Sequence, residues 1–184
     1  MNTPTPRYTM IAITLHWGIA LLIFGGFGLG QYMTELAFSP TKLKLFSWHK
    51  WVGVTVFALV MLRVLWRLSH VPPALPPETP VWQRRVAGAT HGLLYGLMVL
   101  IPLSGWLYSS ASGFQTVYFG VLPLPDLLAR DEHLAGWLKW AHVSLNNLLA
   151  GLVILHVGAA LKHQFVDRDG LLWRMLPGRS TTGE

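Results

Sequence analysis

The sequence LKWAHVSLNNLLAGLVILHVGAAL, residues 138–161, decides the fold that we expect for this chain. It is a run of mostly apolar residues, and its one charged side chain is Lys139, close to its beginning. A helix needs about 20 such residues to cross the hydrocarbon core of a bilayer. The run contains His142 and His156, whose spacing corresponds to about 21 Å along a helix and to within about 40° of one face. The stretch therefore predicts a membrane-spanning helix that presents two imidazoles on one side, at two depths.

Three further stretches have the same length and character. The four expected spans are residues 9–32, 45–68, 87–109 and 138–161. The chain of 184 residues is 52% hydrophobic and only 12% charged, whereas charged residues make up about 25% of a typical soluble domain. We therefore predict an all-α, integral membrane four-helix bundle, with residues 1–184 forming a single transmembrane domain in contact with membrane lipid. Residues 1–8 lack the features of a signal peptide, so the first span is interpreted as a retained helix.

The basic residues predict the orientation of the bundle. The proline-rich segment Ser69–Thr79 cannot form a helix interior and is expected to be a loop. It is flanked by Arg63, Arg67, Arg84 and Arg85. The segment Ser110–Trp137 instead carries the acidic residues Asp126, Asp131 and Glu132. The tail after the fourth span is basic again, with Lys162, Arg168, Arg174 and Arg179. The positive-inside rule then predicts cytoplasmic N- and C-termini and an outer loop at 110–137.

Charge and cysteine content exclude several classes of protein. The formal net charge is +6, but the cations cluster beside apolar runs, which indicates membrane topology rather than nucleic-acid binding. The chain has no cysteine. This excludes disulfides, iron–sulfur clusters held by thiolates, cysteine-ligated haem and covalent haem attachment.

Four histidines within the spans are predicted to pair by depth. Ionisable residues in a membrane are costly and usually functional. In the predicted orientation, His16 lies in the cytoplasmic half at the depth of His156, and His49 lies near the outer face at the depth of His142. Two imidazoles from different helices, on opposite sides of a flat macrocycle, make a six-coordinate haem site in a bundle core. The sequence therefore predicts two haem groups stacked across the membrane.

Other roles for these histidines have to be weighed. A single intramembrane histidine can serve as a hydrogen-bonding residue between helices. A zinc site is disfavoured because each pair lacks a third ligand or a carboxylate. A proton relay or haem-free transporter is disfavoured because the spans contain no Asp or Glu. Two depth-matched pairs favour haem over each of these alternatives.

The motifs along the chain resemble those of the bacterial cytochrome b561 family. In the first three spans they are Arg7-Tyr8, Leu15-His16-Trp17, Trp48-His49-Lys50, Arg63-Val64-Leu65-Trp66-Arg67, His91 and Pro102-Leu103-Ser104-Gly105-Trp106. In the last part they are His142, Asn146-Asn147, His156, Ala159-Ala160-Leu161-Lys162-His163, Asp169-Gly170-Leu171-Leu172 and Arg174-Met175. Their order and spacing are together more specific than any one of them, and they extend from Tyr8 to Pro177.

The resemblance implies a di-haem b cytochrome of the bacterial inner membrane. One class within the family is a superoxide oxidase, which takes electrons from superoxide at the outer face and reduces ubiquinone near the inner face. By resemblance, His16 and His156 are the iron ligands of the inner haem, and His49 and His142 those of the outer haem. The residues expected near the quinone are His91, His163, Arg84 and Arg85. The alternative is a cytochrome b subunit that relays electrons between quinone and a partner dehydrogenase or hydrogenase.

Two lysines are predicted to assist superoxide capture. Lys50 adjoins His49, and Lys139 precedes His142 by about one helical turn. Positive charge beside the outer haem would raise the arrival rate of an anionic substrate. Lysines at span ends also commonly extend to lipid headgroups without any other role. We expect the steering role for Lys50 and Lys139, although the acidic residues of the same loop oppose it.

Overall fold

Four long α-helices make up most of the chain. The structure is a computed structural model that describes residues 7–77 and 79–177. The helices are α1 (Met10–Glu35), α2 (Pro40–Ser69), α3 (Val81–Ala111) and α4 (Glu132–Lys162). Each is long and apolar enough to cross a membrane, by length and composition. The predicted all-α membrane bundle is confirmed.

Helices α1 and α4 begin after residues whose side chains cap the first turn. The Thr9 hydroxyl accepts a hydrogen bond from the Ala12 amide, and the Asp131 carboxylate accepts one from the Leu134 amide. Such caps satisfy amides that have no partner within the helix. The Asp131 cap starts α4 at Glu132, ahead of the run that was expected to begin at 138. The α3 helix also begins early, at Val81 rather than 87, directly after Pro80 and without a side-chain cap. Hydropathy locates the part of a helix inside lipid, whereas the helix itself can extend further, to a capping residue such as Asp131 or to a proline such as Pro80.

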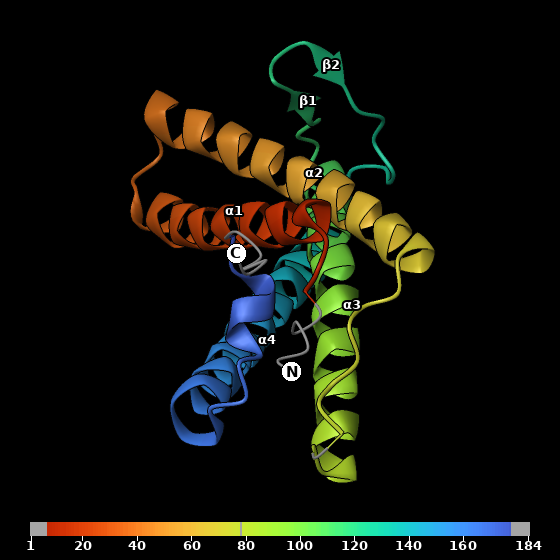
Figure 1. The fold of residues 1–184 in the computed structure, drawn as a ribbon. Helices are drawn as coiled ribbons and strands as arrows, with labels where there is room; N and C mark the ends of the chain where they lie inside the picture. The colour runs from red at the N-terminus through yellow and green to blue at the C-terminus, as the bar shows by residue number, and fades with distance from the viewer. Residues whose placement is uncertain (1–6, 78, 178–184) are drawn as a thin grey trace.

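The helices pack as two antiparallel pairs, α1 with α2 and α3 with α4, and α2 joins the pairs by packing on α3 (Figure 1). The first core cluster contains Leu15, Ile19, Val56 and Val60, and the second contains Leu94, Leu97, Ile101 and Leu149. Large apolar side chains also cover the outside, as at Leu21 and Ile154, each 71% exposed. An exterior this apolar is suited to lipid rather than to water.

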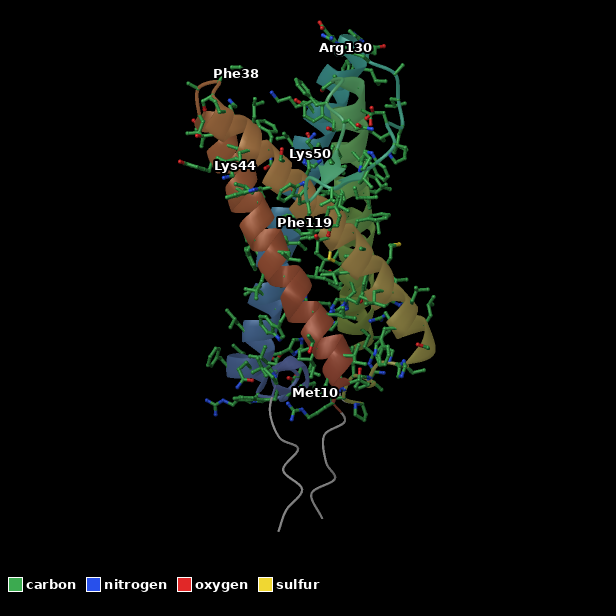
Figure 2. All side chains as sticks on the ribbon, turned by 90° about the horizontal axis from the view of Figure 1, so that it is seen from above. Met10, Phe38, Lys44, Lys50, Phe119 and Arg130 are labelled. Carbon is green, nitrogen blue, oxygen red and sulfur yellow. The ribbon has the colours of Figure 1, made fainter. Side chains whose placement is uncertain are left out.

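The two ends of the bundle differ (Figure 2). We call the end that carries residues 36–39 and 112–131 the hairpin end. Here β1 (Val117–Tyr118) pairs antiparallel with β2 (Leu122–Pro123), through left-handed backbone at Phe119 and Gly120. The hairpin, which sequence analysis did not predict, packs on α2, where the Trp51 indole donates to the Val117 carbonyl over 2.7 Å.

The opposite end, which we call the terminal end, contains both ends of the described chain. After α4 the chain continues as a π-helical turn, η1 (His163–Asp167), and a 3-10 helix, η2 (Leu172–Met175). This segment folds back over the bundle, because the buried Arg174 donates to the Ala74 carbonyl over 2.6 Å and the Trp17 indole donates to the Met175 carbonyl over 2.8 Å. Arg179, counted above in the basic tail, lies outside the described residues.

Candidate functional site

A histidine pair lies near the hairpin end, as the sequence predicted. His49 of α2 and His142 of α4 have ring centroids 6.2 Å apart and ring planes at 85°. The His142 ring is held at one nitrogen: Nδ1 lies 3.1 Å from the Ile101 carbonyl and 2.9 Å from the Ser104 hydroxyl. A carbonyl accepts hydrogen bonds, so Nδ1 carries the hydrogen and the Nε2 lone pair remains available to a metal. Outer hydrogen bonds of this kind fix the tautomer and orientation of metal-binding histidines.

Two glycines leave room for these rings. A Cβ added at Gly30 of α1 would lie 3.2 Å from Cε1 of His49, and one added at Gly105 of α3 would lie 3.0 Å from Cε1 of His142. The buried Nδ1 of His49 has no hydrogen-bond partner of normal geometry within the described residues. Polar atoms buried without a partner are rare in folded proteins. The site is thus shaped around two imidazoles, and one of them lacks a firm protein partner.

Three histidines meet nearer the terminal end. The ring of His156 lies 6.3 Å from that of His16 and 5.5 Å from that of His91. Sequence analysis predicted the first contact and placed His91 near the quinone rather than in ring contact with a ligand. In the described part of the chain, just one set of three His or carboxylate donors lies within 4.8 Å of one another, and it is His163 with Asp167 and Asp169. The three intramembrane histidines therefore do not form a compact three-nitrogen metal site.

The spacing of both predicted pairs fits an iron held between two imidazoles. An imidazole nitrogen binds a first-row metal at about 2 Å, so each ring centroid lies about 3.1 Å from the metal and two opposed rings lie about 6.2 Å apart. The observed 6.2 Å and 6.3 Å agree with this value. Direct hydrogen bonding between two rings would bring them closer than this. These four histidines therefore fit the axial ligands of haem.

The residues predicted near the quinone lie toward the terminal end without forming one cluster. Nδ1 of His163 contacts Asp169 at 2.6 Å and Asp167 at 3.2 Å. The Arg84 guanidinium turns toward the proline-rich loop and donates to the carbonyls of Thr79 and Pro77 at 2.9 Å and 2.6 Å. Arg85 is exposed. No ring contact or hydrogen bond joins any two of His91, His163, Arg84 and Arg85 in the described chain.

The two lysines predicted to steer superoxide differ in setting. Lys50 is partly buried and donates to the Ser109 hydroxyl at 2.9 Å and to the Phe114 carbonyl at 3.0 Å, so it fastens α2 to the 112–131 segment (Figure 2). Lys139 is exposed in a shallow pocket that also contains Arg130 and Glu132. Lys139 is thus the more accessible cation, whereas Lys50 is engaged in a structural contact.

Sequence reasoning missed Ser104 and Gly105 as functional residues. Both lie in the Pro102–Trp106 motif, and both touch the ring of His142. The signal was a pair of small residues, one of them polar, inside an apolar span and at the depth of a predicted ligand.

A membrane helix bundle with histidine pairs at two depths is typical of membrane-bound b-type cytochromes. Known proteins match it along nearly the whole chain. The sequence profile described as prokaryotic cytochrome b561 matches residues 7–178. Cytochrome b561 homolog 2 of Escherichia coli (strain K12) is 35% identical over 98% of this chain and 96% of its own length. The chain therefore belongs to the prokaryotic cytochrome b561 family.

More distant relatives agree with this assignment. A protein of Yersinia pestis called probable superoxide oxidase CybB is 27% identical over 93% of this chain and 96% of its own. Cytochrome b562 of Cereibacter sphaeroides is 29% identical over 96% of this chain and 99% of its own. The resemblance found in the sequence is confirmed. The chain is a multi-pass bacterial membrane cytochrome that binds haem b and has an electron-transfer role.

Proposed function

We propose that the protein oxidises superoxide at the hairpin end and passes the electrons through two haem b groups to ubiquinone at the terminal end. His49 and His142 would hold one haem, and His16 and His156 the other. The observation that carries the proposal is the pair of ring separations, 6.2 Å and 6.3 Å. Haem held by these residues would supply reversible one-electron transfer.

The orientation proposed for the membrane follows from charge. Arg63, Arg67, Arg84 and Arg85 lie in the half of the bundle nearer the terminal end, so the positive-inside rule assigns this end to the cytoplasm. The hairpin end then faces the outside. His142 and His156 are both on α4, and their spacing of fourteen residues corresponds to about 21 Å along the helix. The two pairs therefore lie at different depths, which supports a path for electrons across the bilayer.

The reaction balances with two superoxide anions for each quinone. Each superoxide loses one electron and leaves as dioxygen, and no proton is needed at that end. Ubiquinone takes up the two electrons together with two protons and becomes ubiquinol. The relative called probable superoxide oxidase supports the choice of donor, and exposed Lys139 supplies positive charge at the hairpin end.

His163 is the residue best suited to deliver protons at the terminal end. Its Nδ1 donates to the Asp169 carboxylate over 2.6 Å, and the Asp169 carboxylate also accepts from the Leu171 amide over 3.1 Å. A ring held at Nδ1 by a carboxylate leaves Nε2 as the nitrogen that can contact a ligand. Imidazole can both donate and accept a hydrogen bond, so a quinone carbonyl beside His163 would have a hydrogen-bond partner that can also pass on a proton.

The deciding experiment mixes the purified, haem-loaded protein with superoxide in a stopped-flow spectrometer, without any partner protein. Rapid haem reduction, followed by oxidation when ubiquinone is added, is the expected result. Haem that superoxide does not reduce, but that a dehydrogenase or hydrogenase reduces, would instead identify the chain as a relay subunit. His142→Ala and His16→Ala should each remove a different haem. Because His91 also contacts His156, a His91→Ala variant tests which of the two rings is the second ligand.

A further inference from the structure

Arg63 is a charged side chain inside the bundle, and it forms no salt bridge with any of the described residues. It lies on α2, about 9 Å along the helix from the terminal residue Ser69, and it is partly buried. Its Nε donates to the Tyr95 hydroxyl over 2.8 Å, and Nη1 donates to the Ala12 carbonyl over 3.2 Å. Both partners are neutral. Charges at this depth pair with one another or with backbone carbonyls, and among the described residues no carboxylate pairs with Arg63.

A second guanidinium lies beside the first. Arg67, about one helical turn further along α2, lies 5.8 Å from the centre of the Tyr95 ring, and Arg63 lies 5.9 Å from the same centre. Within the described residues, the salt bridges involve Arg130, Lys162 and His163, and none involves these two arginines. The two side chains therefore concentrate positive charge around one tyrosine.

These arginines line a hollow between α1, α2 and α3. Its walls include Arg63, Arg67, Tyr95, Trp66, Ala12 and Tyr8, and the described lining contains no carboxylate. The hollow encloses about 60 Å³, several times the roughly 10–15 Å³ that one water requires. It is a cationic, aromatic pocket with room for a small acidic group.

The pocket adjoins the histidines nearer the terminal end. Ala12 lies about one helical turn before His16, and Tyr95 lies about one turn after His91. Arg63 is close enough to His16, His91 and His156 to interact with each of them electrostatically. A ligand held by these histidines would therefore have an edge beside the guanidiniums.

We propose that Arg63 and Arg67 bind the propionate carboxylates of the haem held by His156. The inference rests on the proposed function, because it requires a haem at this site. Haem b carries two propionates, and guanidinium binds carboxylate through paired, charge-assisted hydrogen bonds. This contact supplies a counter-charge and turns the acidic edge of the haem toward the α1–α2–α3 corner, away from lipid.

A lipid phosphate is the competing source of negative charge. It fits less well, because Arg63 points to Tyr95 and Ala12 inside the bundle, whereas phosphate groups lie at the membrane surface. Arg67, which is exposed, is the residue that a lipid would reach first.

The test uses resonance Raman spectra of the purified, haem-loaded protein, in which the propionate bending bands report hydrogen bonding to the carboxylates. Redox titration and haem content per chain are measured on the same samples. We expect Arg63→Gln to retain both haems, to shift the propionate bands of one haem and to lower the midpoint potential of that haem. Arg63→Lys should return the midpoint potential close to the wild-type value but leave the propionate bands shifted. Lysine keeps the positive charge but lacks the paired N–H donors of a guanidinium. Arg130→Gln, which removes an exposed cation at the hairpin end, is the control and should change neither.

Unmoved propionate bands in Arg63→Gln, with both haems bound, would overturn the assignment. A simultaneous fall in phospholipid bound per chain would then identify a lipid phosphate as the anion. If Arg63→Gln does not fold, the exposed Arg67→Gln takes its place and should shift the same bands by a smaller amount; no shift there would also overturn the assignment. Wild-type protein that carries no haem would overturn the proposed function, and this inference with it.

Discussion

Gly105 offers a direct test of the histidine pair near the hairpin end. Replacing Gly105 by alanine would place a Cβ 3.0 Å from Cε1 and 3.3 Å from Nδ1 of His142. Carbon atoms in ordinary contact are about 3.5–4.0 Å apart, so the ring must move by a few tenths of an ångström. Distances in a metal site hold to within about 0.2 Å. The displaced ring would bind a metal less well together with His49.

The expected loss of haem affinity in Gly105→Ala can be estimated from the hydrogen bonds of His142. The same movement disturbs the hydrogen bonds of Nδ1 to Ile101 and Ser104. Loss of outer contacts of this kind weakens metal binding by about 10–100-fold. The helix itself should not suffer, because alanine is favoured over glycine in a helix interior by about 1 kcal/mol. Gly105→Ala should therefore weaken one haem site selectively in a protein that is still folded.

The assay is haem content per chain, combined with low-temperature EPR that resolves the two low-spin signals. Gly96→Ala is the matched control, because it is on the same helix and its Cβ would meet nothing within 4 Å. We expect Gly96→Ala to keep two haems and both signals, and Gly105→Ala to lose one of them when haem is limiting. Equal haem content and identical low-spin signals in the two variants would refute the assignment of His142 as a ligand.

Three further predictions concern the two ends of the bundle. His163→Ala should lower the rate of ubiquinol formation several-fold while both haems stay bound, and unchanged turnover would move the quinone site elsewhere. Replacing Lys50 and Lys139 together by glutamine should lower the second-order rate of haem reduction by superoxide by about tenfold or less and flatten its dependence on salt; Lys139 alone should account for most of this, and a rate indifferent to salt and to both changes would exclude steering. His16→Ala should abolish the low-spin signal of the haem near the terminal end, whereas His91→Ala should retain it; the reverse result would exchange their roles.

The spans and the histidine depths could be predicted from the sequence because lipid imposes a simple rule. A helix of known rise crosses a layer of known thickness, so counting residues gives depth. That count placed His49 with His142 and His16 with His156, and the structure has both pairs in ring contact. Counting residues gives the depth of a side chain in the bilayer but not the direction in which it faces around its helix axis. The contact of His91 with His156 therefore did not follow from the count.

The contacts that the sequence did not give depend on the course of irregular segments. Lys50 meets Phe114 because residues 112–131 fold back onto α2, and no apolar periodicity indicates that path. His163 meets Asp169 because the chain reverses after the π-helical turn, with left-handed backbone at Arg168 and Gly170. Glycine suggests such a reversal, but arginine rarely adopts this conformation. Pairings of this kind require coordinates.

The placement of charge in the bundle bears on the direction of electron flow. In the proposed orientation an electron moves inward across about 21 Å of a hydrocarbon layer of about 30 Å. An interior-negative potential opposes this, and crossing the whole layer costs about 2.3 kcal/mol per 100 mV for one charge. A fixed cation about 10 Å away, at an effective dielectric constant of about 20, stabilises an added electron by about 1.7 kcal/mol. Arg63 is close enough to interact with all three histidines of the terminal end, whereas Lys50 beside the other pair is turned toward the loop. Propionates paired with Arg63 and Arg67 would cancel most of this contribution, so the stabilisation is counted relative to the same propionates without these two guanidiniums. Compared with a site without these guanidiniums, the two arginines therefore favour an electron at the terminal-end pair. In the proposed orientation, this offsets part of the opposing potential and would suit the proposed delivery of electrons to a quinone at that end.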